Sequence, residues 1–512
     1  MLAKTFGFAV HGVDARTILI ECNVGQGTRF FMSGLPDNAL KESQLRIESA
    51  LKHLKYFMPR NRTVVNLAPA DIRKEGAAYD LPIALCVLEA SEQISTGKLE
   101  KFIIMGELAL DGGLRPIKGV LPIAIQARKE GFTGLIVPEA NAREAAVVDG
   151  LDVIPVTTLP ETIAFLRGKK VIEPLRINAR ELFRSQSNAY DTDFKDVQGQ
   201  ENIKRALEIA AAGGHNVIMI GPPGAGKTML AKRLPTILPP LTLGEALETT
   251  KIHSVAGKLS RDVGLLTTRP YRSPHHTVSD VALVGGGGNP QPGEISLAHN
   301  GVLFLDELPE FKRTVLEVMR QPMEERRVTI SRAKISIEYP ANFMLVASMN
   351  PCPCGYYNHP EKDCVCGPSV VHRYLNKISG PLLDRIDLHV EVVPVSFDEM
   401  TSNRKAETSA CIRERVIRAR DVQTARFTDH PDVYCNAMMP SNVVKKICAL
   451  DDGGTTLLKI AMERLGLSAR AYDRILKVSR TIADLSGSEH IRSEHLAEAI
   501  QYRSLDRDGW AG

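Results

Sequence analysis

The segment that most constrains the fold of this chain is Gly221-Pro-Pro-Gly-Ala-Gly-Lys-Thr228. It matches the pattern G-x-x-x-x-G-K-[ST] at every fixed position. Its glycines allow the backbone to curl so that successive N–H groups point at phosphate oxygens. Residues 216–220 before it are expected to form a buried strand, and residues 229–234 after it a helix. A chance glycine-rich turn would not need this order, so the segment predicts a phosphate-binding loop in an α/β domain.

The residues of this loop have separate expected roles. Lys227 is expected to reach the β- and γ-phosphates of a nucleotide, and the Thr228 hydroxyl is expected to ligate Mg²⁺. The backbone that encloses the phosphates is expected to come from the rest of the run, namely Gly221, Pro222, Pro223, Gly224, Ala225 and Gly226. The loop therefore predicts a nucleoside triphosphate and Mg²⁺ as cofactors.

Two further strand-like runs end in polar residues. Asp306 and Glu307 follow residues 301–305. An Asp at the end of a neighbouring strand helps to hold Mg²⁺, and a Glu beside it can act as general base for the attacking water. Asn350 ends the run 343–349 and can hydrogen-bond that water or the γ-phosphate. The alternatives are a strand that enters a solvated turn and a turn-forming Asn before a proline.

Two arginines complete the pattern. Arg385 lies in Gly-Pro-Leu-Leu-Asp-Arg-Ile-Asp, and Arg470 ends Leu-Ser-Ala-Arg. Either one alone could be a surface ion-pair residue. Together with the loop, Asp306, Glu307 and Asn350, they resemble the AAA+ ATPases and, more narrowly, the magnesium-chelatase-like branch with its ComM/YifB family. Residues 269–276, 285–294 and 350–355 are similar to the same branch.

The resemblance implies roles and an activity. It implies sensor 1 for Asn350, an arginine finger given across a subunit boundary for Arg385, and sensor 2 on a helical lid for Arg470. It further implies an ATP-hydrolysing ring motor, a homo-hexamer, that acts on DNA as a helicase or in branch migration during integration of transforming DNA. Recombination proteins are then candidate partners. The alternatives are a chelatase-type motor that remodels a protein or inserts metal, and a non-enzymatic scaffold.

The chain divides into regions of different pattern. Residues 1–168 mix strands, expected at 17–22 and 101–105, with helices, and residues 169–190 form a polar linker. Residues 191–395 alternate helices and apolar strands, as a parallel α/β sheet requires. Residues 396–512 have helical spacing throughout and form the expected lid. The fold class is therefore α/β with a helical C-terminal domain.

The N-terminal region contains Gly106–Gly119 and Gly134–Glu139, which resemble the proteolytic domain of Lon, an α/β fold related to ribosomal protein S5. Lon-type catalysis needs a Ser–Lys dyad. The dyad positions fall on Ala78 and Leu121, and Lys118 is three positions early. The resemblance therefore implies a Lon-like domain without proteolysis, which serves as an interaction or DNA-contacting platform.

Cysteines crowd into one short stretch. Cys352, Cys354, Cys364 and Cys366 could enclose a structural Zn²⁺ tetrahedrally. The C-x-C spacing is tighter than the common C-x₂-C, and the alternative is a loop with four reduced thiols. We expect zinc at this position.

A basic hairpin and a histidine pair remain. Residues 325–337 alternate basic and apolar side chains, which predicts a β-hairpin. Arg327, Arg332 and Lys334 could then grip a DNA backbone, or they form an ordinary solvated face. His275 and His276 lie in a Pro- and Gly-rich segment. A metal role and a contact with substrate or a neighbouring subunit both stay open for them.

Composition sets broad limits. Hydrophobic residues make up 44% and charged residues 24%, which is ordinary for a globular protein. The net charge of +4 allows a local basic patch without requiring one. No apolar run approaches the roughly 18 residues of a membrane span, and Asp14 and Arg16 interrupt the apolar N-terminal residues, unlike a signal peptide. The nine cysteines do not form a disulfide framework, so the expected compartment is the reducing cytoplasm.

Overall fold

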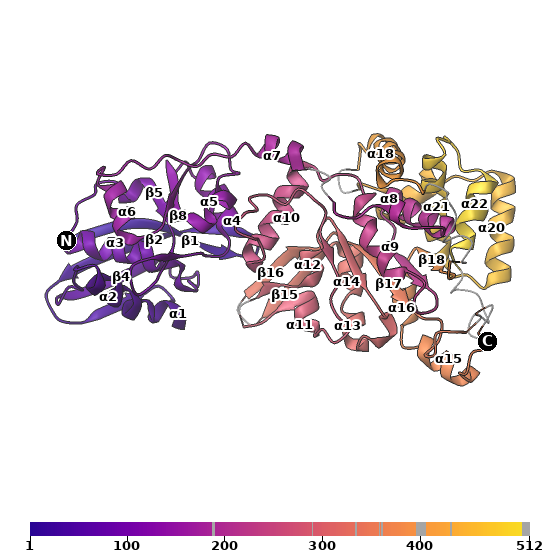
Figure 1. Ribbon diagram of the computed structural model, residues 1–512, viewed down its shortest axis with the longest axis horizontal. Helices are drawn as coiled ribbons and strands as arrows, with labels where there is room; N and C mark the ends of the chain where they lie inside the picture. Colours follow the sequence, from indigo (N-terminus) through magenta and orange to yellow (C-terminus); the bar gives the residue numbers. More distant parts are fainter. Residues whose placement is uncertain are drawn as a thin grey trace.

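The computed structural model describes residues 1–186, 190–288, 290–332, 335–357, 359, 362–395, 406–430 and 433–503. The molecule is elongated, with the N-terminal region at one end, an α/β region in the middle and a group of C-terminal helices at the other end (Figure 1). The predicted α/β class with a helical C-terminal part is confirmed. Among the helices described, none combines the length and the apolar character that a membrane span requires.

The N-terminal region is built on a 7-stranded sheet with the order β3-β4-β2-β1-β5-β8-β9. Its strands are β1 (Leu2–His11), β2 (Asp14–Gly25), β3 (Phe30–Ser33), β4 (Arg62–Ala68), β5 (Phe102–Ile104), β8 (Gly134–Pro138) and β9 (Asp152–Val156), with the short pair β6 (Glu107–Leu108) and β7 (Leu114–Arg115). Its helices are α1 (Asn38–Lys41), α2 (Ser43–His53), α3 (Asp80–Ala90), α4 (Val120–Lys129), α5 (Glu139–Ala145) and α6 (Leu159–Leu166). Both strands expected in this region, at 17–22 and 101–105, are present, in β2 and β5.

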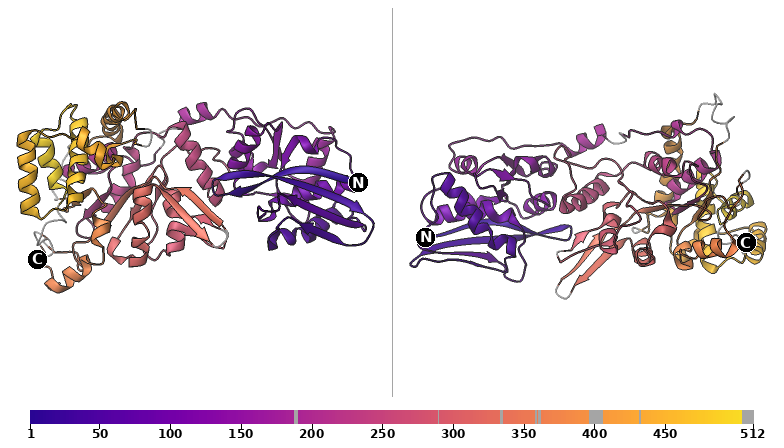
Figure 2. Two further views of the ribbon diagram at one scale, coloured as in Figure 1. Left: turned by 180° about the vertical axis from the view of Figure 1, so that it is seen from behind. Right: turned by 60° about the horizontal axis from the view of Figure 1, so that its bottom comes forward.

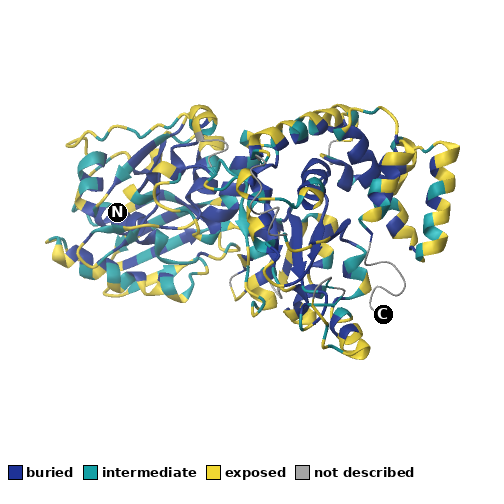
Figure 3. Ribbon diagram, turned by 45° about the vertical axis from the view of Figure 1, so that its right-hand side comes forward, coloured by how far each residue is buried: buried dark blue, intermediate teal, exposed yellow. Residues whose placement is uncertain are grey.

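The central region is built on a 5-stranded parallel sheet with the order β11-β14-β17-β10-β18. The strands are β10 (Val217–Ile220), β11 (Tyr271–Arg272), β14 (Val302–Leu305), β17 (Met344–Met349) and β18 (Leu388–Glu391). Residues of β10, β14 and β17 are all buried (Figure 3), because helices cover both faces of a parallel sheet.

Helices and small strands surround the central sheet. The helices are α8 (Glu201–Gly213), α9 (Lys227–Arg233), α10 (Leu243–Ala256), α11 (Asp280–Val284), α12 (Glu294–Leu297), α13 (Arg313–Glu317), α14 (Arg320–Glu325), α15 (Pro368–Leu375) and α16 (Gly380–Leu383). The small strands are β12 (Gly285–Gly286) with β13 (Gln291–Pro292), and β15 (Arg327–Arg332) with β16 (Ile335–Pro340).

The C-terminal helices pack directly on the central region. They are α18 (Ser409–Arg426), α19 (Ser441–Ile447), α20 (Asp452–Leu465), α21 (Ala469–Leu485) and α22 (Ser493–Gln501). Ile475 and Leu476 of α21 are buried in one hydrophobic core with Ile209 of α8 and Val217 of β10. This shared core fixes the C-terminal helices relative to the central sheet.

The N-terminal and central regions are joined by packing as well as by the chain. The predicted linker contains a helix, α7 (Ala179–Gln186). Helix α10 packs on α4, where the Gly119 N–H donates a hydrogen bond to Ser254 O at 3.1 Å. Leu241, Ala246 and Leu265 of the central region belong to the hydrophobic core of the N-terminal region. Two views in Figure 2 also show the β1–β2 hairpin pointing at the β15–β16 hairpin.

Candidate functional site

The phosphate loop connects β10 to α9 at the carboxyl edge of the central sheet. Gly224 and Gly226 have φ angles of +80° and +84°, in the left-handed region that glycine adopts without steric cost. A Cβ atom on Gly224 would meet no heavy atom within 4 Å, so the loop is open beside this residue. The run Gly221–Thr228 thus forms the curled loop that its sequence predicts.

The Lys227 ammonium is directed into the loop and is nearly buried. Its Nζ donates hydrogen bonds to Gly221 O at 2.7 Å, to Pro222 O at 2.9 Å and to Asn350 Oδ1 at 3.2 Å. Burial lowers the pKa of Lys227, while the two carboxylates that follow β14 act in the opposite direction. The three ammonium donors can exchange these oxygens for those of a phosphate.

Asp306 meets two hydroxyl groups. Thr228 Oγ1 donates to Asp306 Oδ2 at 2.9 Å, and the Ser348 hydroxyl donates to the other carboxylate oxygen. Hydroxyl and carboxylate oxygens are the hard ligands that Mg²⁺ prefers, so this pair fits the metal. Sequence reasoning missed Ser348. It lies two residues before Asn350 and therefore on the same face of β17, which is the signal that could have found it.

Glu307 adjoins this carboxylate. Its φ of +54° is uncommon for a residue other than glycine, and its backbone N–H donates to Asp306 Oδ1 at 3.1 Å. The Glu307 side chain is 56% exposed, and its Oε2 lies 3.6 Å from Nδ1 of His276. Glu307 therefore combines a position beside the phosphate loop with the access to water that a general base needs.

Arg385 lies at the opposite, amino edge of the sheet. Its carbonyl oxygen accepts a hydrogen bond from Asn216 Nδ2 at 3.1 Å, and Asn216 immediately precedes β10. The guanidinium is held by Glu324 Oε1 at 2.5 Å from Nη2 and by Pro381 O at 2.6 Å from Nη1. Strand β10, about 13 Å long at 3.3 Å per residue, separates Arg385 from the loop of its own chain.

Arg470 is not brought to the phosphate loop. Its Nη1 donates to Asp384 Oδ2 at 3.2 Å, and its side chain is 63% exposed. One turn later on α21, Arg474 Nη1 donates to the buried Asp387 at 2.7 Å. Arg470 and Arg474 therefore both contact the segment around Arg385, at the amino edge.

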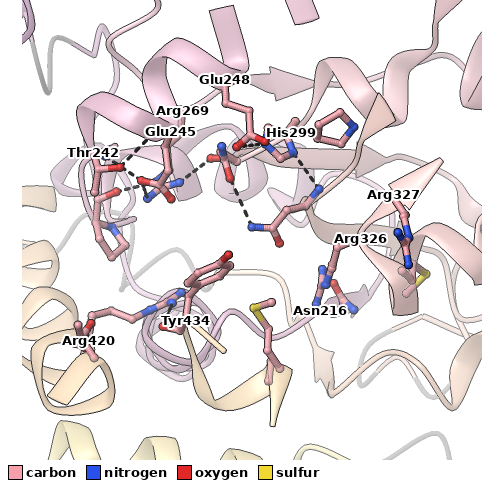
Figure 4. Close-up of a pocket in the computed structure, with 18 of the residues that line it drawn as sticks. Asn216, Thr242, Glu245, Glu248, Arg269, His299, Arg326, Arg327, Arg420 and Tyr434 are labelled. Atoms are coloured by element: carbon pink, nitrogen blue, oxygen red, sulfur yellow. Dashed lines mark hydrogen bonds and ion pairs between the residues drawn. The ribbon is translucent and has the colours of Figure 1, made fainter. Parts of the chain in front are cut away.

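A cavity of about 1180 Å³ opens at this amino edge. In Figure 4, Asn216, Arg326 and Arg327 line one side, and Arg420 and Tyr434 lie across from them. The basic side chains that line it are Arg269, Arg326, Arg327, Arg385, Arg420, Arg474 and Lys477, and the acidic ones are Glu245, Glu248, Glu324, Glu325 and Asp421. Burial lowers the pKa of Lys477 to about 8. The lining of the cavity thus contains more basic than acidic side chains.

The four predicted zinc cysteines lie together. Sγ of Cys352 is 3.3 Å from Sγ of Cys354 and 3.6 Å from Sγ of Cys364, and the four sulfurs, with that of Cys366, are all within 4.8 Å of one another. Sulfurs on a tetrahedral Zn²⁺ are about 3.8 Å apart, given a Zn–S bond of about 2.3 Å. The donor set and spacing therefore fit a closed zinc site.

This cysteine loop touches the phosphate loop. Gly355 has a φ of +86°, and a Cβ atom there would lie 2.6 Å from Pro223 Cδ. The contact leaves no room for a side chain at residue 355. The order of the cysteine loop therefore bears directly on the backbone that surrounds the phosphates.

The predicted basic hairpin is present as β15 and β16. Arg327 Nη1 lies 3.6 Å from Glu338 Oε2, so its charge is partly offset across the hairpin. Arg332 ends β15, and Lys334 lies outside the described residues. On the other side, a Cβ on Gly12 would lie 3.0 Å from Cγ2 of Ile337, so the hairpin packs on the tip of the β1–β2 hairpin.

The two positions that correspond to the Lon dyad differ in burial, because Leu121 is buried and Ala78 is half-buried. Leu121 is fully buried, and its N–H donates to Glu144 Oε1 at 2.9 Å. The Ala78 carbonyl accepts from the Gly106 N–H at 2.8 Å. The Glu144 carboxylate also accepts a hydrogen bond from the Ser254 hydroxyl of α10. This corner of the N-terminal region therefore serves as a contact with the central region.

Comparison with known proteins adds an independent line of evidence. The family models described as "Subunit ChlI of Mg-chelatase", "Magnesium chelatase, subunit ChlI" and "Magnesium chelatase, subunit ChlI C-terminal" match residues 20–141, 193–400 and 406–503. Together these models cover most of the chain.

Relatives match over the whole length. The chain is 45% identical to Competence protein ComM of Haemophilus influenzae over 509 residues, which are 99% of this chain and 98% of that protein. It is 44% identical to the uncharacterised protein YifB of Escherichia coli over 503 residues, 98% of this chain and 96% of that protein. It is also 33% identical to Lon protease 2 of Bacillus subtilis over 159 residues, 28% of this chain and 27% of that protein. The chain therefore belongs to the magnesium-chelatase-like AAA+ ATPases, in the family that contains ComM and YifB.

Proposed function

We propose that this chain is an ATP-hydrolysing ring motor that acts on DNA, of the helicase or branch-migration type. The observation that carries the proposal is the separation of Arg385 from the phosphate loop by the whole central sheet. An arginine at this edge can act only on a nucleotide bound to a neighbouring chain. Closed rings are the symmetric assemblies in which every chain offers such an arginine and receives one.

Within one chain, the residues at the carboxyl edge have complementary roles. The loop backbone and Lys227 bind the triphosphate, while Thr228 and Asp306 hold Mg²⁺, which when bound neutralises charge on the phosphates. Glu307 accepts a proton from the attacking water, and Asn350 orients that water or the γ-phosphate. Arg385 of the neighbouring chain stabilises the charge that develops on the transferred phosphoryl group.

The amino edge matches the other half of the interface. Its cavity carries the positive charge that a neighbouring triphosphate requires, and Glu324 holds the Arg385 guanidinium in the absence of that phosphate. Arg470 lies beside Arg385, so we assign it to the same interface rather than to the nucleotide of its own chain. We propose a homo-hexamer for the working form, by similarity to the family.

DNA is the proposed substrate for two reasons. One relative that matches almost the whole chain is named a competence protein, and integration of transforming DNA is a recombination process in which recombination proteins would be partners. The β15–β16 hairpin also exposes Arg327, and basic side chains on a hairpin can bind phosphates of either strand.

The test is ATP turnover measured with and without single-stranded, duplex and branched DNA. Stimulation by DNA, strongest with a branched substrate, supports the proposal. ATP turnover that no DNA stimulates favours the chelatase-type motor, which acts on a protein or a metal. A chain that binds ATP without turnover contradicts the motor altogether.

We also propose one structural Zn²⁺ per chain on the four cysteines. Elemental analysis of untagged protein, purified without added metal, tests this. Four thiols that titrate readily in fully active, metal-free protein contradict it. We further propose the division into residues 1–168, 191–395 and 396–512, with 169–190 as the linker, and a DNA-contacting or interaction role for the first region.

A further inference from the structure

The sheet of the N-terminal region has two edge strands, and they differ in what lies beside them. At the β9 edge, the Leu175 N–H donates a hydrogen bond to Val153 O at 2.8 Å, so the segment after α6 covers part of that strand. At the other edge, β3 pairs with β4 and with no further strand of the described chain. In the right-hand view of Figure 2, indigo strands of this region lie along the margin of the molecule. An uncovered edge offers unpaired backbone groups to another chain.

The register of β3 identifies the free backbone groups. The Thr63 N–H of β4 donates to Arg29 O at 3.0 Å, just before β3 begins. Because the backbone groups of successive residues point to opposite sides of a strand, Phe31 also faces β4, whereas Phe30 and Met32 face outward. Within the described part of the chain, nothing bonds to the outward N–H and C=O groups. Each of these two residues therefore offers one donor and one acceptor to an added strand.

The side chains of β3 divide between core and solvent. Phe30 and Met32 pack against the hydrophobic core of the N-terminal region. Phe31 lies on the opposite face of the sheet and is 42% exposed, and the Arg62 guanidinium is 5.2 Å from its ring centroid. A Cβ atom on Gly27 would lie 3.0 Å from Cβ of Arg62, so this arginine also packs against the loop after β2. An aromatic ring and a positioned guanidinium therefore lie beside the free edge.

The segments that form this edge are basic. Residues 22–36 and 54–70, which include β3 and β4 with their adjoining loops, contain four cations and no Asp or Glu. The four cations, all exposed, are Arg29, Lys55, Arg60 and Arg62. Glu21, which lies two strands in from the edge on β2, is paired with Lys4 at 3.4 Å. The free edge is therefore suited to an acidic ligand.

The free edge fits a peptide better than two other ligands. The backbone of a nucleic acid offers phosphate acceptors, which cannot pair with the outward carbonyl groups of β3. A second copy of this edge would bring the same cations together, and like charges on paired strands are destabilising. An extended peptide supplies donors and acceptors in alternation, as in other cases of strand addition. Acidic side chains on such a peptide would also meet the arginines.

We propose that the free edge of β3 binds an extended acidic segment of a partner protein as an added strand. The backbone of the segment pairs with Phe30 and Met32, an apolar side chain packs beside Phe31, and acidic side chains approach Arg29 and Arg62. This inference rests on the interaction role proposed for the first region. It requires neither ATP turnover nor DNA, so it stands or fails separately from the proposed motor.

The first experiment identifies the chemistry of the peptide. A phage-displayed library of random linear peptides is selected on full-length wild type. Enriched sequences should carry a net negative charge with apolar residues at alternate positions, as a strand with one contacting face requires. A consensus peptide is then synthesised with a fluorescent label, and its binding to full-length protein is measured by fluorescence anisotropy.

Substitutions then locate the binding surface. F31A should weaken peptide binding by about 2- to 10-fold, because the contact with an aromatic ring is lost. R62Q should weaken it by about 2- to 5-fold, the factor for one exposed ion pair. K129Q removes an exposed cation of α4 instead and should bind as wild type does. Thermal unfolding of each variant shows that the fold is retained.

Backbone methylation of the peptide tests the pairing itself. Two forms of the consensus peptide are compared, one N-methylated at odd positions and the other at even positions. Both keep the side chains and the charge, but only one keeps the N–H groups that face β3. One form should therefore bind about 10-fold or more weakly, because its donors to β3 are lost, while the other binds as the parent peptide does.

Several outcomes overturn the proposal. Equal affinities of the two methylated forms refute strand addition, and enriched sequences that are basic or uncharged refute the charge match. A peptide that binds wild type, F31A and R62Q equally refutes this surface but leaves an interaction role for the first region, whereas a library that yields no binder removes both. Displacement of the peptide by oligothymidine shows a nucleic-acid site instead. Self-association of wild type that F31A and R62Q abolish, measured by sedimentation velocity, shows pairing of two copies.

Discussion

Polar residues lie at both edges of the central sheet, but their hydrogen-bond partners differ. At the carboxyl edge, Lys227 and Thr228 follow a glycine-rich loop, and their partners are acceptors that a nucleotide and Mg²⁺ can replace. At the amino edge, Asn216 and Asp387 are buried and their bonds join strands to one another and to α21. At the carboxyl edge, the hydrogen-bond partners can be exchanged for a ligand. At the amino edge, the hydrogen bonds hold the fold together.

The difference shows how a parallel sheet can serve two nucleotides. In the proposed ring, the exchangeable edge binds the nucleotide of its own chain, and the fixed edge presents Arg385 to the nucleotide of the next. A guanidinium offered to another molecule needs a rigid support, because an ill-placed arginine stabilises the transition state poorly.

The largest effect is expected from Arg385→Ala. Turnover should fall by about 10³–10⁵-fold with ATP binding retained, because the amino edge takes no part in binding the nucleotide of its own chain. Mixing R385A with K227A chains should restore part of the activity, since some interfaces then pair an intact loop with an intact arginine. Absence of rescue in rings that contain both variants would contradict an action between chains.

Glu307→Gln removes the proposed general base at the carboxyl edge. Turnover should fall by about 10²–10⁴-fold with ATP still bound, because the amide keeps the size of the side chain but cannot accept the proton. Lys227→Ala should weaken ATP binding itself, which a nucleotide-binding titration distinguishes. The matched control is Glu310→Gln, an exposed carboxylate three residues on that pairs with Lys377, and it should leave both quantities unchanged.

Asp387→Asn tests the rigidity of the amino edge. Burial alone would raise the pKa of Asp387, but Arg474, His215 and the Asn216 N–H together hold that pKa well below its ordinary value. Loss of the charge should lower the free energy of unfolding by about 3–5 kcal/mol at pH 7, because the buried side chain at 387 no longer offers a charge to the half-buried Arg474. Denaturant unfolding measures this, with exposed Asp429→Asn as control.

The same variant has a pH signature. A carboxyl whose pKa is depressed by folding stabilises the protein above its unfolded pKa of about 3.9 and loses this contribution as the pH falls. The stability difference between wild type and D387N should therefore shrink below about pH 4. A difference that does not shrink below about pH 4 would contradict the charged pair.

The smallest effect is expected at the hairpin. Arg327→Ala should reduce the slope of log binding constant against log salt by roughly one unit on DNA, because one phosphate contact is lost. Any change in basal ATP turnover should be small beside that of R385A, since Arg327 lines the cavity at the amino edge but its charge is paired with Glu325 and Glu338. Arg418→Ala, an exposed arginine on α18, is the control. Equal slopes for wild type and R327A would indicate that the hairpin is a solvated face that does not bind DNA through Arg327.

The residues at the carboxyl edge could be predicted because each is marked by a short stretch of sequence. Lys227 and Thr228 follow from one eight-residue pattern, and Asp306 and Asn350 each follow an apolar run that had to be a buried strand. The support of the amino edge depends on residues far apart in the chain. Asn216 meets Arg385, and Arg470 meets Asp384, only after the sheet and α21 have packed. No short sequence pattern indicates these contacts. The packing of α10 on the N-terminal region was missed for the same reason.

The position of α10 has a practical consequence for dissecting the protein. Ala246 of α10 and the nearby Leu241 and Leu265 are buried against the core of the N-terminal region, although they follow the linker in the chain. A truncated chain that begins after residue 190 would leave these side chains in water as an apolar patch, which favours aggregation. Truncation at the linker therefore would not yield a well-behaved fragment of the central and C-terminal regions. The contribution of the N-terminal region is better tested by substitutions on its own outer surface.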